Sequence, residues 1–201
     1  MGEMRLFVAV NLPPDVRERL GAVRDRLRRA QADVSWVRVE NLHITLKFLG
    51  ETEEKRLDRI RDVLAEVTRA CAPFSLQVTG VGSFGGRVPR VVWAGMSEGA
   101  DCLTQLAGQV ESALARVGFP KEKRSFSAHL TLGRVRSPRN TEALLAALHE
   151  FHAEKFGTLA ATEFQLMQSE LRPTGSVYTI LERFPLGARE GGEKSEDRHA
   201  D

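Results

Sequence analysis

Cross-linking and metal-binding residues are scarce in this chain. Its 201 residues include only two cysteines, Cys71 and Cys102, and neither belongs to a Cys-x-x-Cys pair or a Cys/His cluster. A disulfide framework or a structural zinc site needs several such residues at short spacing. Both are therefore excluded. This cysteine usage is typical of a reduced compartment, so we expect a cytoplasmic protein.

Long apolar runs are also absent. The apolar stretch at residues 6–10, after Arg5, is too short for a signal sequence or a membrane span, and no later stretch approaches the required length. With 42% hydrophobic residues, the chain still has enough apolar side chains for a buried core. We therefore expect a soluble protein with no membrane partner.

Neither sign of charge predominates, since 29 basic and 27 acidic side chains give a net charge of +2. The distribution is more informative. Four arginines of one predicted helix lie among acidic neighbours, and we expect them to form a solvated face: Arg24, Arg26, Arg28 and Arg29. Six other basic residues flank the stretch 129–132 on both sides, as a phosphate or polyanion site requires: Lys121, Lys123, Arg124, Arg134, Arg136 and Arg139.

One short motif occurs twice. Residues 43–46 read His-Ile-Thr-Leu and residues 129–132 read His-Leu-Thr-Leu. The alternation of polar and apolar residues predicts a strand, in which the His and Thr of each copy share one face and the two apolar residues enter a core. A single copy would be ordinary packing, but packing accepts Val or Ile at these positions equally well. The repetition therefore indicates function.

The motif belongs to a longer repeat. In each half, a strand with an aromatic centre leads to an amphipathic helix and then to the His-x-Thr strand, and 36 residues separate Phe7 from His43 and Trp93 from His129. Two similar halves related by an approximate two-fold axis would place the motifs opposite each other across a central cleft. We predict a bilobal α+β fold of mostly antiparallel sheet with helices outside.

The rest of the chain fits one domain over residues 1–187. The predicted strands are 6–10, 36–39, the two motif strands from 43 and 129, 74–81, 91–94, 157–169 and 176–184. The predicted helices are 13–32, 52–72, 100–117 and 141–152. We expect a glycine-rich loop at 82–86 and a hairpin turn at 172–175. Residues 188–201 contain no large apolar side chain, which predicts a disordered tail.

Two opposed imidazoles can act in one step, the neutral ring removing a proton from a nucleophile and the protonated ring donating one to a leaving oxygen. In-line displacement at a phosphodiester needs this arrangement, because the nucleophile and the leaving group lie on opposite sides of phosphorus. The hydroxyls of Thr45 and Thr131 are placed to hold the nonbridging oxygens. At this point the residues do not tell which histidine is the acid.

Other chemistries fit less well. Two histidines are too few for a catalytic zinc, and neither motif strand has a carboxylate on its His-Thr face, so we expect no metal and no cofactor. A Gly-x-Ser-x-Gly nucleophile elbow is missing. The glycines at 80–86 lack the Gly-Lys-Ser/Thr ending of a phosphate-binding P-loop.

The motifs resemble those of the two-histidine (2H) phosphoesterase superfamily, and in particular its RNA 2′,3′-cyclic phosphodiesterase family, also called 2′-5′ RNA ligase. Residues 5–10 (Arg-Leu-Phe-Val-Ala-Val), 40–50 (Glu-Asn-Leu-His-Ile-Thr-Leu-Lys-Phe-Leu-Gly) and 178–186 carry the similarity, which covers nearly all of the chain before the tail. One departure is Ser127-Ala128, where the family often has Pro before the second His.

The resemblance implies a bilobal α+β fold and metal-free hydrolysis of a terminal RNA 2′,3′-cyclic phosphate to a 2′-phosphate. It implies that His43 is the proton donor to the departing 3′ oxygen and His129 the proton acceptor that activates water, with the roles exchanged in a reverse 2′-5′ ligation. By the same resemblance Arg134 contacts the phosphate that Thr45 and Thr131 hold. Lys47 shares the His43 face by strand parity and is a further, weaker candidate for substrate binding.

Two alternatives stay open. The same site would also suit a small cyclic phosphate, such as a cyclic nucleotide or a tRNA-splicing by-product. A non-catalytic RNA-binding module is the alternative of another class; it predicts salt-sensitive binding without turnover, and the sequence lacks RNP-like aromatic motifs. We expect RNA or an oligonucleotide with a cyclic phosphate end as the partner of a monomeric protein.

Overall fold

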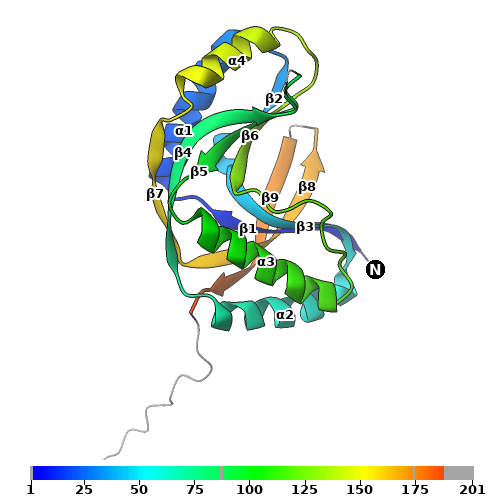
Figure 1. Cartoon of the computed structure of the whole chain (residues 1–201). Helices are drawn as coiled ribbons and strands as arrows, with labels where there is room; N and C mark the ends of the chain where they lie inside the picture. Colours follow the sequence, from blue (N-terminus) through cyan, green and yellow to red (C-terminus); the bar gives the residue numbers. More distant parts are fainter. Residues whose placement is uncertain (1, 87, 174, 188–201) are drawn as a thin grey trace, which may run out of the picture.

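The computed structural model describes residues 2–86, 88–173 and 175–187 and consists of two antiparallel sheets with helices packed outside them (Figure 1). The predicted α+β fold with two lobes is confirmed. The predicted tail, residues 188–201, lies outside the described residues.

The first sheet has the strand order β3-β1-β8-β9 and the second the order β2-β6-β5-β4-β7. The first contains β1 (Glu3–Asn11), β3 (His43–Glu53), β8 (Glu163–Arg172) and β9 (Gly175–Pro185). The second contains β2 (Val34–Trp36), β4 (Phe74–Phe84), β5 (Val91–Met96), β6 (His129–Val135) and β7 (Lys155–Ala161). Each motif strand thus pairs with the aromatic-centred strand of its own half, β3 with β1 and β6 with β5.

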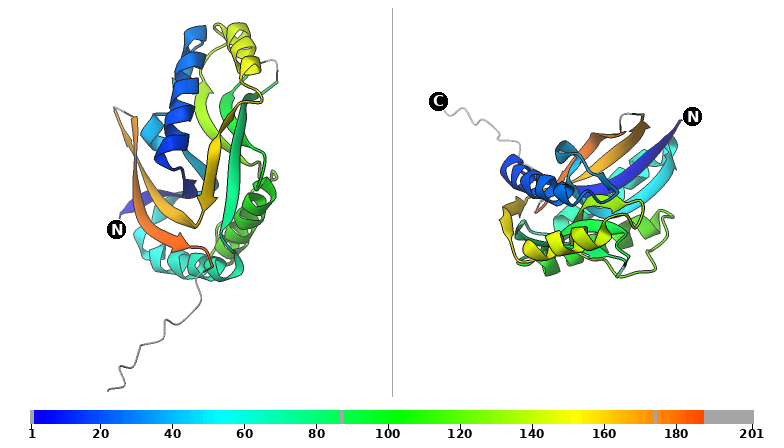
Figure 2. Two further views of the ribbon diagram at one scale, coloured as in Figure 1. Left: turned by 90° about the vertical axis from the view of Figure 1, so that its left-hand side faces the viewer. Right: turned by 90° about the horizontal axis from the view of Figure 1, so that it is seen from above.

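The four helices of the described residues are α1 (Pro14–Leu27), α2 (Leu57–Ala70), α3 (Ala100–Arg116) and α4 (Thr141–Glu150). Two of them, α1 and α3, each pack on the sheet that does not contain the strand before them. Helix α1 follows β1 of the first sheet but packs on β7 of the second, beside α4. Helix α3 follows β5 of the second sheet but packs on β3 of the first, beside α2. Figure 2 shows the two helix pairs at opposite ends of the molecule. This exchange joins the two halves.

Both faces of the first sheet are apolar near β3. In β1, Leu6, Val8 and Val10 enter the large core that the helices cover. Because side chains alternate along a strand, Phe7 and Ala9 point to the other face, where they form a small cluster with Met167, Tyr178 and Ile180. This second cluster lies on the face that carries His43, since Asn11, which has the same parity as Phe7, pairs with His43.

Some predicted boundaries were wrong. The run 157–169 is two strands, β7 and β8, which belong to different sheets and meet at Thr162, a corner that no Gly or Pro marks. Strand β4 continues to Phe84 because it pairs with β5 as far as Val91, so the predicted loop at 82–86 is shorter. Strand β3 continues to Glu53, opposite Glu3 of β1, and α2 starts correspondingly later.

Candidate active site

The two motif strands lie against each other where the sheets meet. One cavity of about 310 Å³ opens between them, with Thr45 of β3 on one wall and His129 and Thr131 of β6 on the other. Arg134 also lines it, as do three phenylalanines: Phe48, Phe84 and Phe126. His43 is not part of the cavity wall. It shares a face of β3 with Thr45, and its ring packs on Phe7 and Tyr178.

Both imidazoles make the same backbone hydrogen bond. The Nδ1 atom of His43 lies 2.7 Å from the carbonyl oxygen of Asn41, and Nδ1 of His129 lies 2.7 Å from that of Ser127. A carbonyl only accepts, so Nδ1 carries the proton and donates in both rings. In a neutral ring Nε2 is then the free acceptor, and in a charged ring it is the donor. The sequence did not reveal these two carbonyls, which fix the tautomer that acid-base chemistry needs.

Each imidazole also packs edge-to-face against an aromatic ring. Tyr178 of β9 stands at 87° to His43 with 5.2 Å between ring centroids, and Phe84 of β4 stands at 86° to His129 with 5.0 Å. Phe7 adds a second ring to His43 at 4.9 Å. None of these aromatic partners is close to its histidine in the sequence, so only the sheet pairing brings them together.

The surroundings of His43 change its acidity. Burial lowers the pKa of His43 from its ordinary value of 6.5, because a charged ring would lose hydration there; the hydrogen bond to Asn41 acts in the opposite direction but is the smaller effect. His43 therefore releases its proton at a lower pH than an exposed histidine.

A β-bulge in each motif strand changes which residues face the cavity. Between Thr45 and Lys47 the register with β1 skips Leu46, so Lys47 pairs with Val8 of the core face, and Phe48 pairs with Phe7 of the His-Thr face. The expectation that Lys47 shares the His43 face was wrong, because strand parity does not hold across the bulge.

The bulge in β6 is equivalent. The register with β5 skips Leu132, so Gly133 pairs with Val92, and Arg134 pairs with Val91. Val91 has the parity of Trp93, the partner of Thr131, so Arg134 lies on the His-Thr face. Regular alternation would have turned a residue five positions after His129 to the opposite side.

Lys47 instead holds the loop that precedes β6. Its side chain is 2% exposed, and Nζ donates to the carbonyl of Pro120 at 2.9 Å and lies 3.4 Å from Glu111 and 3.6 Å from Glu122. The backbone N–H of Glu122 is the main cause that lowers the pKa of Glu111, and Lys47 adds to it while burial opposes both. These contacts tie α3 to the loop that leads to Ser127 and His129.

We expect Lys47→Met to lower the free energy of unfolding by about 1.5–3 kcal/mol, because it removes charge-assisted hydrogen bonds at a buried site. Urea denaturation measures this. The matched control is Lys55→Met: Lys55 pairs with Glu53 but is 61% exposed, and its loss should cost less than about 1 kcal/mol. Equal costs for the two variants would contradict the positioning role of Lys47.

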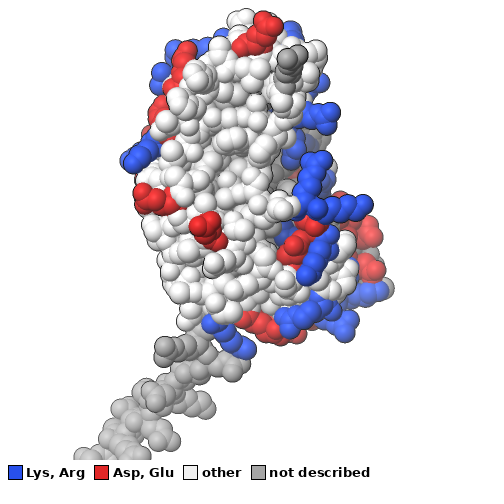
Figure 3. Space-filling model, in the orientation of Figure 1, with Lys and Arg blue, Asp and Glu red and all other residues white. Residues whose placement is uncertain are grey.

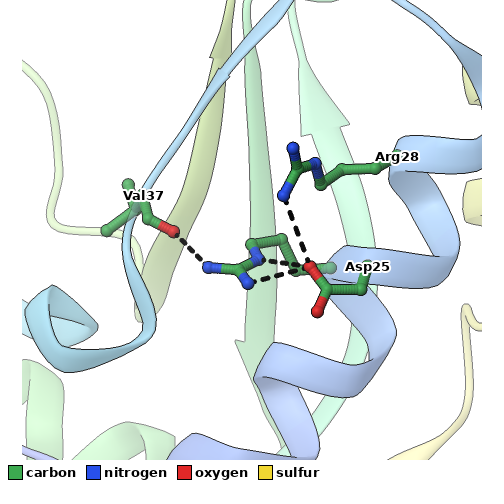
Figure 4. A network of polar contacts seen from close by, with 4 residues as sticks. Asp25, Arg28 and Val37 are labelled. Atoms are coloured by element: carbon green, nitrogen blue, oxygen red, sulfur yellow. Dashed lines mark hydrogen bonds and ion pairs between the residues drawn. The ribbon is translucent and has the colours of Figure 1, made fainter.

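The predicted solvated arginine face was wrong for Arg24, whose side chain is 13% exposed, whereas Arg26, Arg28 and Arg29 are exposed as expected. Arg24 donates from Nη1 to the carbonyl of Val37 at 3.0 Å and from Nη2 to Asp25 at 2.8 Å, with Arg28 on the same carboxylate (Figure 4). Arg26 stacks its guanidinium over the ring of Phe151. Arg24 thereby fixes the segment that leads from α1 to Asn41 and β3.

In Figure 3 basic side chains are densest along the right-hand edge, where acidic side chains lie among them, and a few others lie on the left edge; the broad face toward the viewer is largely uncharged. The three basic residues before β6, Lys121, Lys123 and Arg124, are exposed, and so is Arg134 on β6. In residues 2–86, 88–173 and 175–187, no group of three or more His, Cys, Asp or Glu side chains is arranged to hold a metal ion. No helix in the same ranges is long and apolar enough to cross a membrane.

Comparison with known proteins identifies the family of this chain. Residues 10–93 and 95–178 match the family described as "LigT like Phosphoesterase", with one His-x-Thr motif in each segment. A protein of Archaeoglobus fulgidus named RNA 2′,3′-cyclic phosphodiesterase is 41% identical over 90% of this chain and 99% of its own. A protein of the same name from Methanothermobacter thermautotrophicus is 37% identical over 92% and 100%.

A solved structure shares the fold. The crystal structure of E. coli LigT complexed with 3′-AMP superposes with a TM-score of 0.75 at 30% identity, covering 93% of this chain and 100% of that chain. The chain therefore belongs to the LigT-like phosphoesterase family.

Proposed function

We propose that this protein hydrolyses RNA 2′,3′-cyclic phosphate ends to 2′-phosphates without a metal ion. The observation that carries the proposal is that the two strands bearing the His-Thr pairs lie against each other, with Thr45, His129, Thr131 and Arg134 around one cavity. The names of the relatives support the same substrate.

In the proposed reaction His129 removes a proton from water as the water oxygen bonds to phosphorus, and His43 donates a proton to the 3′ oxygen as its bond to phosphorus breaks. Because Nδ1–H of each ring donates a hydrogen bond to a backbone carbonyl, Nε2 is the atom that accepts or donates the proton in the reaction. Thr45, Thr131 and the Arg134 guanidinium would hold the nonbridging oxygens, where charge increases in the transition state. In the reverse direction, a 2′-5′ ligation, the two histidines exchange roles.

The choice between RNA ends and small cyclic nucleotides depends on contacts beyond the phosphate. Phe48 is 57% exposed on the cavity wall, and an exposed ring beside a phosphate site is suited to stack on a nucleobase. The exposed basic residues before β6 would bind backbone phosphates of the RNA further from its cyclic phosphate end. Both features favour an oligonucleotide.

The test is turnover of a short RNA ending in a 2′,3′-cyclic phosphate, in EDTA, with the product phosphate located by NMR. We expect a 2′-phosphate and a higher kcat/KM than for a mononucleotide cyclic phosphate. Loss of activity in EDTA would contradict the metal-free mechanism. Binding without turnover would favour the RNA-binding module, and a preference for the mononucleotide would favour the small-molecule enzyme.

The lowered pKa of His43 predicts an unusual pH dependence. As the acid, His43 must be protonated in the free enzyme, so the alkaline limb of kcat/KM should have its midpoint below pH 6.5. The bound phosphate anion favours the imidazolium, so the alkaline limb of kcat should lie at higher pH than that of kcat/KM. Initial rates from pH 4.5 to 9 measure both; identical limbs above pH 7 would contradict this assignment.

We also propose that the protein acts as a monomer in the cytoplasm. Both motif strands and Arg134 come from the same chain, so the site needs no second copy, and the scarce, unpaired cysteines favour a reduced compartment. Light scattering after size exclusion tests the monomer, and an active dimer that loses activity on dilution would contradict it.

A further inference from the structure

His43 is held from two sides by β9, a strand at the far end of the described chain. The Asn41 side chain donates from Nδ2 to the carbonyl of Ser176 at 2.8 Å, and the Asn41 carbonyl accepts the Nδ1–H bond of His43 at 2.7 Å. Two residues beyond Ser176, the Tyr178 ring packs edge-to-face on the same imidazole. These contacts form a closed circuit that runs from His43 through Asn41 and Ser176 to Tyr178 and back to His43.

The two β9 residues in these contacts, Ser176 and Tyr178, are themselves held by the first sheet. Tyr178 contacts Phe7 with 5.1 Å between centroids, and both belong to the small apolar cluster on this face of the first sheet. Ser176 and Tyr178 are fixed to β8 by the ladder that pairs them with Leu171 and Ser169. A shift of β9 would therefore move the His43 ring and its hydrogen-bond acceptor together.

The second half of the molecule holds His129 differently. Ser127, which accepts the Nδ1–H bond of His129, is an exposed residue of the loop before β6. Phe84 packs on His129 as Tyr178 packs on His43, but it is 39% exposed and belongs to β4. The two imidazoles thus make the same kind of hydrogen bond, but the acceptor of His43 is anchored to β9 whereas the acceptor of His129 lies in an exposed loop.

We propose that Ser176 and Tyr178 make β9 a positioning element that fixes the orientation of the His43 imidazole and shields it from water. Tyr178 is a positioning residue in this sense: it acts through His43 and has no assigned contact with substrate.

Few charged groups face His43 and could change its pKa. From β1 the residues that face it are Phe7 and Asn11, and from β9 it is Tyr178. On its own strand Lys47 points to the core side, toward Glu111 and Pro120. From β6, His129 and Arg134 line the cavity beside Thr45. Burial is also the largest cause of the lowered pKa of His43, which agrees with a shielding role for Tyr178.

The test measures His43 directly and does not need turnover. Histidine ring signals are followed by NMR from pH 4.5 to 8.5, with His43 assigned by its loss in His43→Ala. We expect Tyr178→Leu to raise the pKa of His43 toward its ordinary value, because water reaches the ring. Tyr178→Phe keeps the ring and should titrate like the wild type. An unchanged His43 titration in a folded Tyr178→Leu protein would overturn the proposal.

Two control variants separate shielding from loss of stability. Ile180→Ala removes an apolar side chain from the same cluster and the same strand face, so it should lower the melting temperature while leaving the His43 titration unchanged. Phe84→Leu removes the ring that packs on His129 and should also leave the His43 titration unchanged. If either variant moves the His43 pKa as far as Tyr178→Leu does, the effect is not specific to the Tyr178 ring and the proposal fails.

A kinetic test rests on the proposed function. With the cyclic phosphate RNA, Tyr178→Leu should lower kcat about 10- to 100-fold with a smaller change in KM, since the imidazole is no longer held in one orientation. The alkaline limb of kcat/KM should move to higher pH, as the NMR titration does. If the wild type shows no turnover, the proposed function fails while the NMR result still decides the role of Tyr178.

Discussion

Replacing His43 or His129 by alanine is expected to lower kcat about 10²- to 10⁴-fold on an RNA with a 2′,3′-cyclic phosphate end, because each removes one of the two proton-transfer groups. KM should change much less, since Thr45, Thr131 and Arg134 would still hold the phosphate. The matched control is His149→Ala. His149 stacks on His152 and lies on α4, away from the cavity walls, so its loss should leave kcat unchanged.

A sulfur substitution distinguishes the two roles. A substrate with sulfur in place of the 3′ oxygen has a leaving group that needs little protonation. His43→Ala should therefore regain most of its lost rate on this substrate, whereas His129→Ala should remain as slow as on the oxygen substrate. Rescue of His129→Ala alone would exchange the acid and the base, and near-full activity of either variant on the oxygen substrate would contradict the two-histidine mechanism.

Arg134→Gln is expected to lower kcat about 10²- to 10³-fold, the usual cost of removing one donor to the developing charge of a transition state. Among the described residues, Arg134 is the one Lys or Arg of the cavity wall that lies on the His-Thr face, since Lys47, which also lines the cavity, belongs to the core face of β3. Glutamine keeps a hydrogen-bonding amide but is uncharged and two atoms shorter, so the loss reports the charge, the fork of donors and the reach of the guanidinium.

Arg136→Gln is the control for a non-specific effect of charge. Arg136 follows β6 closely, but its Nη2 donates to Ser35 Oγ at 3.1 Å instead of lining the cavity. We expect Arg136→Gln to weaken RNA binding slightly at low salt and to leave kcat unchanged. If the two variants lose the same rate, the effect belongs to the basic surface as a whole and Arg134 has no specific role.

The repeat was the most informative feature of the sequence. Equal spacing from Phe7 to His43 and from Trp93 to His129 predicted two similar halves, and the structure pairs β3 with β1 and β6 with β5 accordingly. This prediction succeeded because strand alternation and helical periodicity are local properties, which a sequence displays directly.

The sequence was less informative wherever a local rule was broken. Period-two alternation placed Lys47 beside His43, and the bulge at Leu46 placed Phe48 there instead. The same kind of bulge brings Arg134 to the cavity, where the resemblance and not the pattern had placed it. A bulge depends on how one strand fits its neighbour, so a single strand carries no clear signal for it.

The sequence by itself determined the α+β class, the two His-Thr strands and the chemistry that two imidazoles and two hydroxyls suit. The tertiary structure alone decided what surrounds them. It set the ring partners Tyr178 and Phe84, the anchor from Asn41 to Ser176, and the role of Lys47 in holding the loop before β6. The physical reason is distance along the chain: Asn41 and Ser176 are 135 residues apart, and only the pairing of distant strands brings such groups into contact.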